Sequence, residues 1–113
     1  MTRDCADPEM LAEFYRRATG FELHPESGSE FAGLNRADGQ FLGFQRVANY
    51  RAPQWPDQVV PQQIHLDFEV EDLDTAEAML VESGATKPEH QPAGDKGRVL
   101  IDPAGHPSCI TLV

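Results

Sequence analysis

The sequence predicts an α+β fold made of two similar halves. Each half has a helical segment followed by three short extended segments, so one order of elements occurs twice in the 113 residues. In both halves a glycine ends the helical segment, and a later glycine lies in a turn at a similar distance along the chain. The second half also opens with a strictly alternating strand. We therefore expect two units, each a strand, a helix and three strands.

The helix of the first half is predicted over residues 7–19. Asp7 is a good helix cap and Pro8 suits a first helical position, and apolar residues then follow at helical spacing as far as Gly20. Three extended runs come next, at Phe21–Leu23, Glu30–Asn35 and Gln40–Val47. Only five residues precede the helix cap region, so the leading strand is either very short or the chain begins late.

The second half starts at residues 64–70, which give the clearest strand signal of the chain. Apolar side chains occupy one face of this strand, and His65, Asp67 and Glu69 occupy the other. Asp72 then caps a helix that Gly84 closes. Short extended runs follow at Ala85–Lys87, Gly97–Asp102 and Ser108–Val113. In the last run Cys109 and Ile110 point to opposite faces, which is consistent with Cys109 sharing the face of His65.

Composition and charge exclude several classes of protein. Nineteen acidic against nine basic residues give a formal charge of −10, so binding to nucleic acid or to an anionic membrane surface is not expected. No apolar run approaches the length of a membrane helix, and the N-terminus lacks the apolar core of a signal peptide. We expect a cytoplasmic protein with Cys5 and Cys109 as free thiols.

Several short motifs follow one another along the chain. They are Asp4-Cys5-Ala6-Asp7-Pro8, Leu11-Ala12-Glu13-Phe14-Tyr15, Gly20-Phe21, Leu42-Gly43-Phe44-Gln45-Arg46-Val47, His65-Leu66-Asp67, Gly84-Ala85 and Asp102-Pro103-Ala104-Gly105-His106-Pro107. Their order and spacing resemble the glyoxalase-like branch of the vicinal oxygen chelate superfamily, which includes bleomycin-resistance-like proteins. The resemblance implies two βαβββ modules, residues 1–48 and 62–113, in one domain. Their curved mixed sheets would form a shared cup, with the helices outside.

The resemblance also implies a metal site. Enzymes of this superfamily typically hold one divalent ion with His and Glu or Gln side chains from both modules, with open positions for substrate oxygens. His65 stands at the second-module histidine position, Gln45 near the first-module Glu or Gln position, and Cys109 where relatives carry Glu. The first-strand histidine would precede Met1. The expected ligands of a Zn, Ni, Mn or Fe ion are therefore His65, Gln45 and Cys109, and the alternative is that no metal binds and these residues are structural.

Polar and aromatic residues near the expected cup are candidates for substrate binding. They are His65, Asp67, Gln45, Tyr50 and Trp55. Asp67 or Glu69 would orient the imidazole of His65 or act as a base, or both would be solvated carboxylates that attract a cationic ligand. Tyr50 and Trp55 lie in the proline-rich connecting loop 49–61, where they would form a stacking lid or cover a subunit interface. His24, His90 and His106 are expected at the surface.

The sequence thus predicts a protein that binds a small molecule. With a divalent metal it would be a lyase, an isomerase or a dioxygenase. The alternative is a non-catalytic binding or antibiotic-sequestering protein. The incomplete ligand set, the charge of −10 and the loop aromatics favour a cationic, partly aromatic ligand in that case. Exposed sheet edges predict a homodimer.

Overall fold

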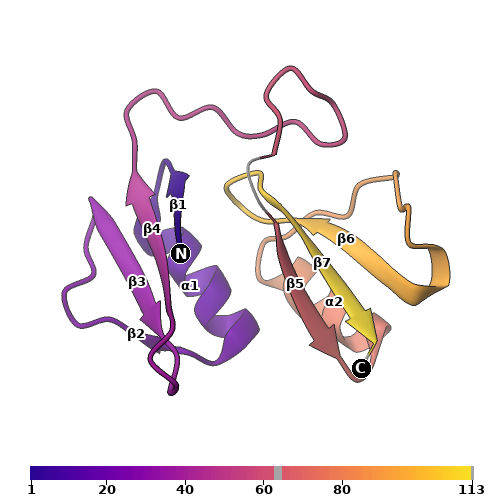
Figure 1. The fold of residues 1–113 in the computed structure, drawn as a ribbon, viewed down its shortest axis with the longest axis horizontal. Coiled ribbons are helices and arrows are strands. Elements are labelled where there is room, and N and C mark those ends of the chain that lie inside the picture. Colours follow the sequence, from indigo (N-terminus) through magenta and orange to yellow (C-terminus); the bar gives the residue numbers. More distant parts are fainter. Residues whose placement is uncertain (63–64, 113) are drawn as a thin grey trace. The chain divides into compact units, whose positions relative to one another are not determined.

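A computed structural model describes residues 1–62 and 65–112. The chain forms two compact units, Met1–Arg51 and Ala52–Val113. Each unit has its own helix and its own small mixed sheet (Figure 1), as the predicted α+β fold requires. Among the described residues no helix has the length and apolar character needed to cross a membrane.

The first unit follows the predicted order of a strand, a helix and three strands. Its elements are β1 (Thr2–Cys5), α1 (Pro8–Thr19), β2 (Glu22–Leu23), β3 (Phe31–Asn35) and β4 (Phe41–Arg46). The strands lie in the order β1-β4-β3-β2, with β1 parallel to β4 and the other pairs antiparallel. The leading strand is thus present and short, and it carries no histidine.

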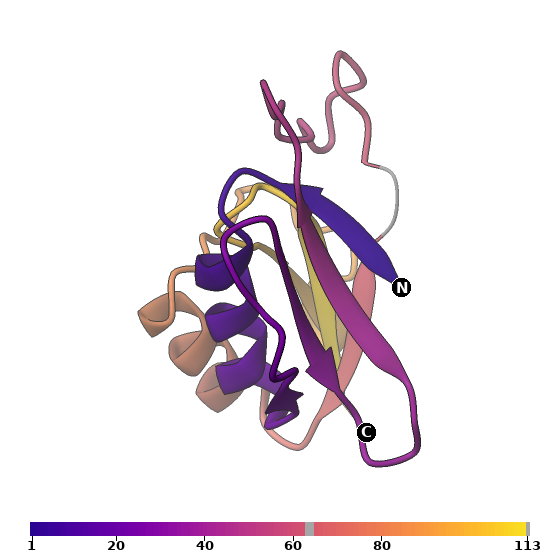
Figure 2. The same ribbon diagram turned by 90° about the vertical axis from the view of Figure 1, so that its left-hand side faces the viewer.

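Helix α1 forms where the capping residues predict it. The Asp7 side chain accepts a hydrogen bond from the backbone N–H of Met10 at 3.1 Å, and Gly20 ends the helix in the left-handed region at φ 77°. The apolar face of α1 packs on one side of β3 and β4 (Figure 2), and the ring of Tyr15 stacks on that of Phe44 at 5.4 Å. The core of the first unit therefore lies between α1 and one face of the sheet.

The second unit contains one strand fewer than predicted. Its elements are β5 (Leu66–Val70), α2 (Leu73–Glu82), a 3-10 turn η1 (Gly94–Lys96), β6 (Gly97–Ile101) and β7 (Pro107–Leu112). The expected strand at 85–87 is reduced to one bridge between Thr86 and Ile101. The strands lie in the order β5-β7-β6, with β5 parallel to β7 and β6 antiparallel to it. Ile64, predicted to begin β5, lies outside the described residues.

The two faces of this sheet differ as the alternation predicts. Arg98 of β6 reaches α2, where it lies 2.7 Å from Asp74 and 3.2 Å from Glu77. Its register partner Ile110, and Phe68 opposite Ile110, share that face. Asp67 and Cys109, which are register partners, lie on the face turned away from α2. The polar side of β5 is thus the open side of its sheet.

The connecting segment contains no helix or strand between Val47 and Gln62. From Ala52 onward it belongs to the second unit. The Trp55 ring lies 5.3 Å from the ring of His90, and the backbone N–H of Gln54 donates to the Val60 carbonyl at 2.6 Å. This segment therefore packs on the second unit. The cup shared by the two units stays a prediction.

The prediction that His106 is a surface residue is wrong. His106 is only 6% exposed. Asp102 holds the turn before β7, because its Oδ1 accepts hydrogen bonds from the backbone N–H groups of Ala104 and His106, both at 2.9 Å. His106 is the last residue of that turn and directly precedes β7, and its side chain is buried.

Candidate functional site

Three side chains of different chemistry meet on the open face of the second sheet. The donor atoms of His65, Asp67 and Cys109 all lie within 4.8 Å of one another. Nδ1 of His65 is 3.2 Å from Oδ1 of Asp67. Cys109 is the register partner of Asp67 on the neighbouring strand. Asp67 is therefore the central member of this His–Asp–Cys cluster.

The register of two parallel strands builds the cluster. Asp67 of β5 lies opposite Cys109 of β7, so their side chains leave the same face of the sheet as neighbours. His65 comes two residues before Asp67 and, by the same alternation, shares that face. The side chains of His65 and Asp67 are 38% and 64% exposed, while Cys109 is half-buried. The cluster is thus open to a molecule that approaches this face.

Burial raises the pKa of the Cys109 thiol, and the negative charge and hydrogen bond of Asp67 raise it further. The thiol is therefore protonated at neutral pH in the absence of a metal. Since thiolates are the nucleophilic form of cysteine, Cys109 is poorly suited to nucleophilic catalysis. Both cysteines are free thiols, as predicted.

The donor set of the cluster fits a divalent metal. Imidazole nitrogen, carboxylate oxygen and thiolate sulfur are all zinc ligands, at distances that put the donors of a tetrahedral site about 3.3–3.8 Å apart. The 3.2 Å between His65 and Asp67 is close to that separation, and the 4.8 Å bound leaves only a small adjustment for Cys109. Three protein ligands also leave a fourth position for a ligand, as catalytic zinc sites do.

The structure distributes the other predicted site residues over both units. Gln45 is an exposed residue of β4 in the first unit, where it lies opposite Phe31 and Asp4. Tyr50 also belongs to the first unit, while Trp55 belongs to the second and contacts His90. Within the second unit, the predicted ligands His65 and Cys109 are brought together, and Asp67 joins them. The ligand role of Gln45 and the lid role of Tyr50 and Trp55 stay predictions.

An aromatic pair on the first sheet was not predicted. The rings of Phe31 and Phe41 lie 5.9 Å apart with nearly parallel planes, on the face opposite α1. A signal for this pair exists in the sequence, because Phe31-Ala32-Gly33 and Phe41-Leu42-Gly43 repeat one F-x-G spacing in adjacent strands. Together with Gln45, which is the register partner of Phe31, the pair lines the open side of the first sheet.

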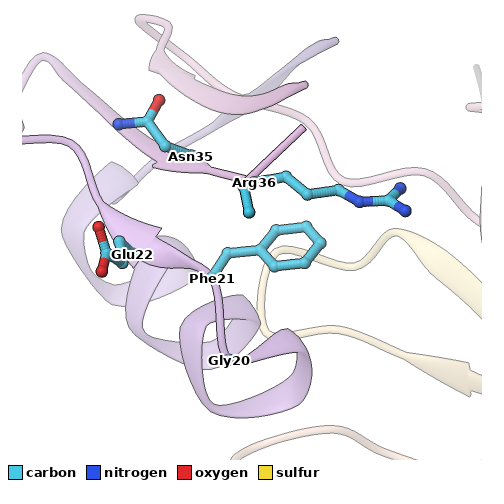
Figure 3. Close-up of a pocket in the computed structure, with 6 residues that line it drawn as sticks. Gly20, Phe21, Glu22, Asn35 and Arg36 are labelled. Carbon is cyan, nitrogen blue, oxygen red and sulfur yellow. The ribbon is translucent and has the colours of Figure 1, made fainter. Parts of the chain in front are cut away.

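A hollow of about 390 Å³ lies where β2 begins and β3 ends. Its lining residues are Gly20, Phe21, Glu22, Asn35, Arg36 and Ala37. Figure 3 shows the Phe21 and Arg36 side chains extending in one direction, and those of Glu22 and Asn35 in the other. Arg36 is paired with Asp38 at 3.2 Å. The hollow brings together no cluster of metal ligands or nucleophiles.

The sequence of residues 1–111, which is nearly the whole chain, matches the family model of the glyoxalase-like domain. The chain belongs to the glyoxalase-like domain family. It is thus a member of the vicinal oxygen chelate superfamily, as the motifs predicted. No curated protein matched the sequence of this glyoxalase-like domain.

Solved structures share the fold of this glyoxalase-like domain. A glyoxalase/bleomycin resistance protein/dioxygenase family enzyme from Burkholderia phytofirmans PsJN superposes with a TM-score of 0.73 at 18% identity, over 100% of this chain and 95% of the other. A possible glyoxalase from Bacillus cereus gives 0.71 at 19% identity, over 98% and 94%. The oxidase ChaP-H2 gives 0.66 at 24% identity, over 100% and 90%. At these identities the likeness concerns the fold.

Proposed function

We propose that this glyoxalase-like domain binds a small molecule beside a divalent metal ion held by His65, Asp67 and Cys109. The observation that carries the proposal is the meeting of a nitrogen, an oxygen and a sulfur donor within 4.8 Å on an open sheet face. The mixed donor set matches zinc best. When bound, such an ion polarises an oxygen atom of the ligand as a Lewis acid.

The chain's own residues have distinct roles in this proposal. Asp67 orients the His65 ring through its contact at 3.2 Å and supplies negative charge to the site. Cys109 gives up its proton when the ion binds, so metal affinity rises with pH. This arrangement supports a lyase, isomerase or dioxygenase activity.

Metal retention tests the proposal. Protein stripped with a chelator, soaked in zinc and then dialysed is expected to keep about one zinc per chain, as measured by mass spectrometry of the metal. The variants His65→Ala and Cys109→Ala should each lose most of the bound zinc, because the residues around the ligands cannot coordinate the ion in place of a missing ligand. With cobalt in place of zinc, a thiolate-to-metal absorption band should appear in wild type and be absent in Cys109→Ala.

Matched controls make the test specific. Glu69→Gln removes an exposed carboxylate two residues from Asp67 on the same strand, and His90→Ala removes a histidine of the same unit outside the cluster. Both controls should retain zinc like wild type, while Asp67→Asn should not. Equal zinc in wild type, His65→Ala and Cys109→Ala refutes the proposed centre.

One observation favours the alternative of a binding protein without a metal. The three groups already interact without an ion, because Asp67 pairs with His65 at 3.2 Å and its charge acts on the Cys109 thiol. In that case the metal-stripped protein binds its ligand as tightly as the zinc-loaded protein, and no zinc survives dialysis. Calorimetry on both forms separates the two functions.

A homodimer belongs to the same proposal. Strand β2 lies at one end of its sheet, where it pairs with β3, and a strand at the end of a sheet can pair with a second chain. Light scattering during size-exclusion chromatography should give twice the 12.5 kDa of one chain. A mass of one chain refutes the dimer and leaves the metal centre untouched, because all three proposed ligands come from one chain.

A further inference from the structure

The connecting segment contains a loop that is closed on itself. The backbone N–H of Gln54 donates to the Val60 carbonyl at 2.6 Å, and the backbone N–H of Val59 donates to Oδ1 of Asp57 at 3.0 Å. These hydrogen bonds join residues of the loop to one another, and neither of them joins the loop to a helix or strand. We call residues 54–60 the tryptophan loop, because it carries Trp55.

A contact between two rings joins the tryptophan loop to the polar segment that follows α2. The ring centroids of Trp55 and His90 lie 5.3 Å apart, and their planes are tilted by 46°. Trp55 is half-buried, whereas His90 is exposed. Solvent therefore reaches the imidazole while that ring contacts the indole.

His90 has a fixed position because its neighbour Gln91 is bonded to β6. The side-chain amide of Gln91 donates to the carbonyls of Pro88 and Val99, at 2.8 and 3.0 Å. Its Oε1 accepts a hydrogen bond from the backbone N–H of Val99 at 2.9 Å. The amide thus pairs with both backbone groups of Val99, as a neighbouring strand would. The Trp55 ring therefore contacts an imidazole that is anchored at the edge of β6.

Protonation changes the strength of this contact. An imidazole gains a positive charge as the pH falls through its usual pKa of about 6.5. A cation within about 6 Å of an indole ring is attracted by the π electrons, and at exposed sites this attraction changes an equilibrium constant about two- to fivefold. The 5.3 Å between the rings of Trp55 and His90 lies within that range. The charged imidazole therefore holds the indole more firmly than the neutral imidazole does.

Few charged groups surround His90. Glu89 precedes it in the chain, and the tryptophan loop contributes Asp57, which accepts the backbone N–H of Val59. Arg98, the charged residue of β6, is paired with carboxylates of α2. Among the ion pairs formed within residues 1–62 and 65–112, none includes His90. Since carboxyl groups ordinarily titrate near pH 4, the imidazole is the group of this contact that changes charge between pH 5.5 and pH 8.

We infer that His90 is a pH-dependent clasp for the tryptophan loop. The protonated ring fastens Trp55 to the second unit at mildly acidic pH, and loss of the proton loosens the loop as the pH rises. The inference goes beyond the proposed function, because neither Trp55 nor His90 is a proposed metal ligand. The clasp therefore stands or falls independently of the metal centre.

Trp55 is the single tryptophan of the chain, so its fluorescence reports on this loop alone. Quenching by acrylamide is measured on metal-stripped protein at pH 5.5 and pH 8, and each quenching constant is corrected for the fluorescence lifetime. In wild type the constant should be about two- to fivefold smaller at pH 5.5, because the closed clasp shields the indole. Equal constants at the two pH values overturn the inference.

Two variants of His90 fix the clasp in one state each. His90→Gln keeps a polar side chain without a titratable charge, so quenching should be strong at both pH values. His90→Arg carries a positive charge at both, and a guanidinium stacks well on an aromatic ring, so quenching should be weak at both. The inference is refuted if His90→Gln keeps the wild-type pH difference, or if His90→Arg behaves like His90→Gln.

Further variants locate the proton and test the anchor. Gln91→Ala removes the bonds to β6 and should reduce the pH difference, whereas Glu89→Gln, on the other side of His90, should keep it. His65→Ala should also keep the difference. A difference that disappears in His65→Ala would mean that the proton acts at the His–Asp–Cys cluster, and the clasp would be wrong. Circular dichroism at both pH values confirms that each variant is folded.

Discussion

Asp67 and Cys109 are register partners on the parallel strands β5 and β7, and the Asp67 carboxylate and the Cys109 sulfur lie within 4.8 Å of each other. A neighbouring negative charge disfavours the thiolate, so it acts in the same direction as burial. The carboxylate beside Cys109 therefore keeps the thiol protonated until a metal ion binds the sulfur and displaces the proton.

Asp67→Asn should make Cys109 more reactive. Loss of the carboxylate charge lowers the thiol pKa toward its usual range, so the thiolate fraction near pH 8 grows and alkylation by iodoacetamide speeds up about threefold to tenfold. Peptide mass spectrometry reads the modification at Cys109 separately from that at the fully buried Cys5. Glu69→Gln is the control and should react at the wild-type rate. An unchanged rate in Asp67→Asn would contradict the pairing.

The stability of the metal-stripped protein should fall with rising pH because of Cys109. The folded-state pKa of this thiol is raised, so between the unfolded value of about 8.5 and the folded value the native state holds more protons than the unfolded state. The free energy of unfolding therefore decreases as pH rises through that window. Urea unfolding at pH 7 and pH 10 should show a smaller loss for Cys109→Ala than for wild type. Equal losses would count against the raised pKa.

Gly105→Ala and Gly39→Ala form a matched pair of backbone tests. Both glycines are left-handed, with φ of 91° and 90°, so alanine strains both by about 1 kcal/mol. A Cβ on Gly105 would also lie 2.6 Å from the Cβ of Ala52, whereas nothing lies within 4 Å of one on Gly39. Amide hydrogen exchange, measured on the strands of each unit, should show the larger destabilisation for Gly105→Ala. Equal effects would mean that the segment around Ala52 moves aside freely.

Asp102→Ala should destabilise the second unit. Asp102 is 4% exposed, and its Oδ1 accepts two backbone N–H groups of the turn that leads into β7. Removing this acceptor leaves those donors unsatisfied at a cost of about 1–3 kcal/mol. Urea unfolding followed by circular dichroism measures the change. Asp95→Ala, at an exposed residue of η1, is the control and should cost less than about 0.5 kcal/mol.

Local signals were sufficient to predict much of the fold. Asp7, Pro8 and Gly20 fix the ends of α1 through contacts within a few residues, so the sequence itself reveals them. The alternation from His65 to Glu69 likewise predicts which side chains of β5 share a face, because the period of a strand is two. Residues 85–87 have the same short extended pattern but find a partner only at Ile101, so they form a bridge in place of a strand.

The candidate site depended on contacts that no local pattern contains. His65 and Cys109 were named as candidates through the family resemblance, but the central position of Asp67 follows from its pairing with Cys109 across a parallel ladder. The burial of His106 depends in the same way on the packing of the turn held by Asp102. The F-x-G spacing of Phe31 and Phe41 was visible, yet its meaning requires knowing that Gly33 and Gly43 lie opposite each other.

The parallel pairing of β5 with β7 joins the first strand of the second unit to its last. During synthesis on the ribosome, Asp67 emerges before Cys109, and it has no sulfur partner until β7 has left the exit tunnel. The cluster consequently assembles after the other helices and strands of the second unit have been made. A nascent or prematurely terminated chain would lack it altogether, however well its earlier part had folded.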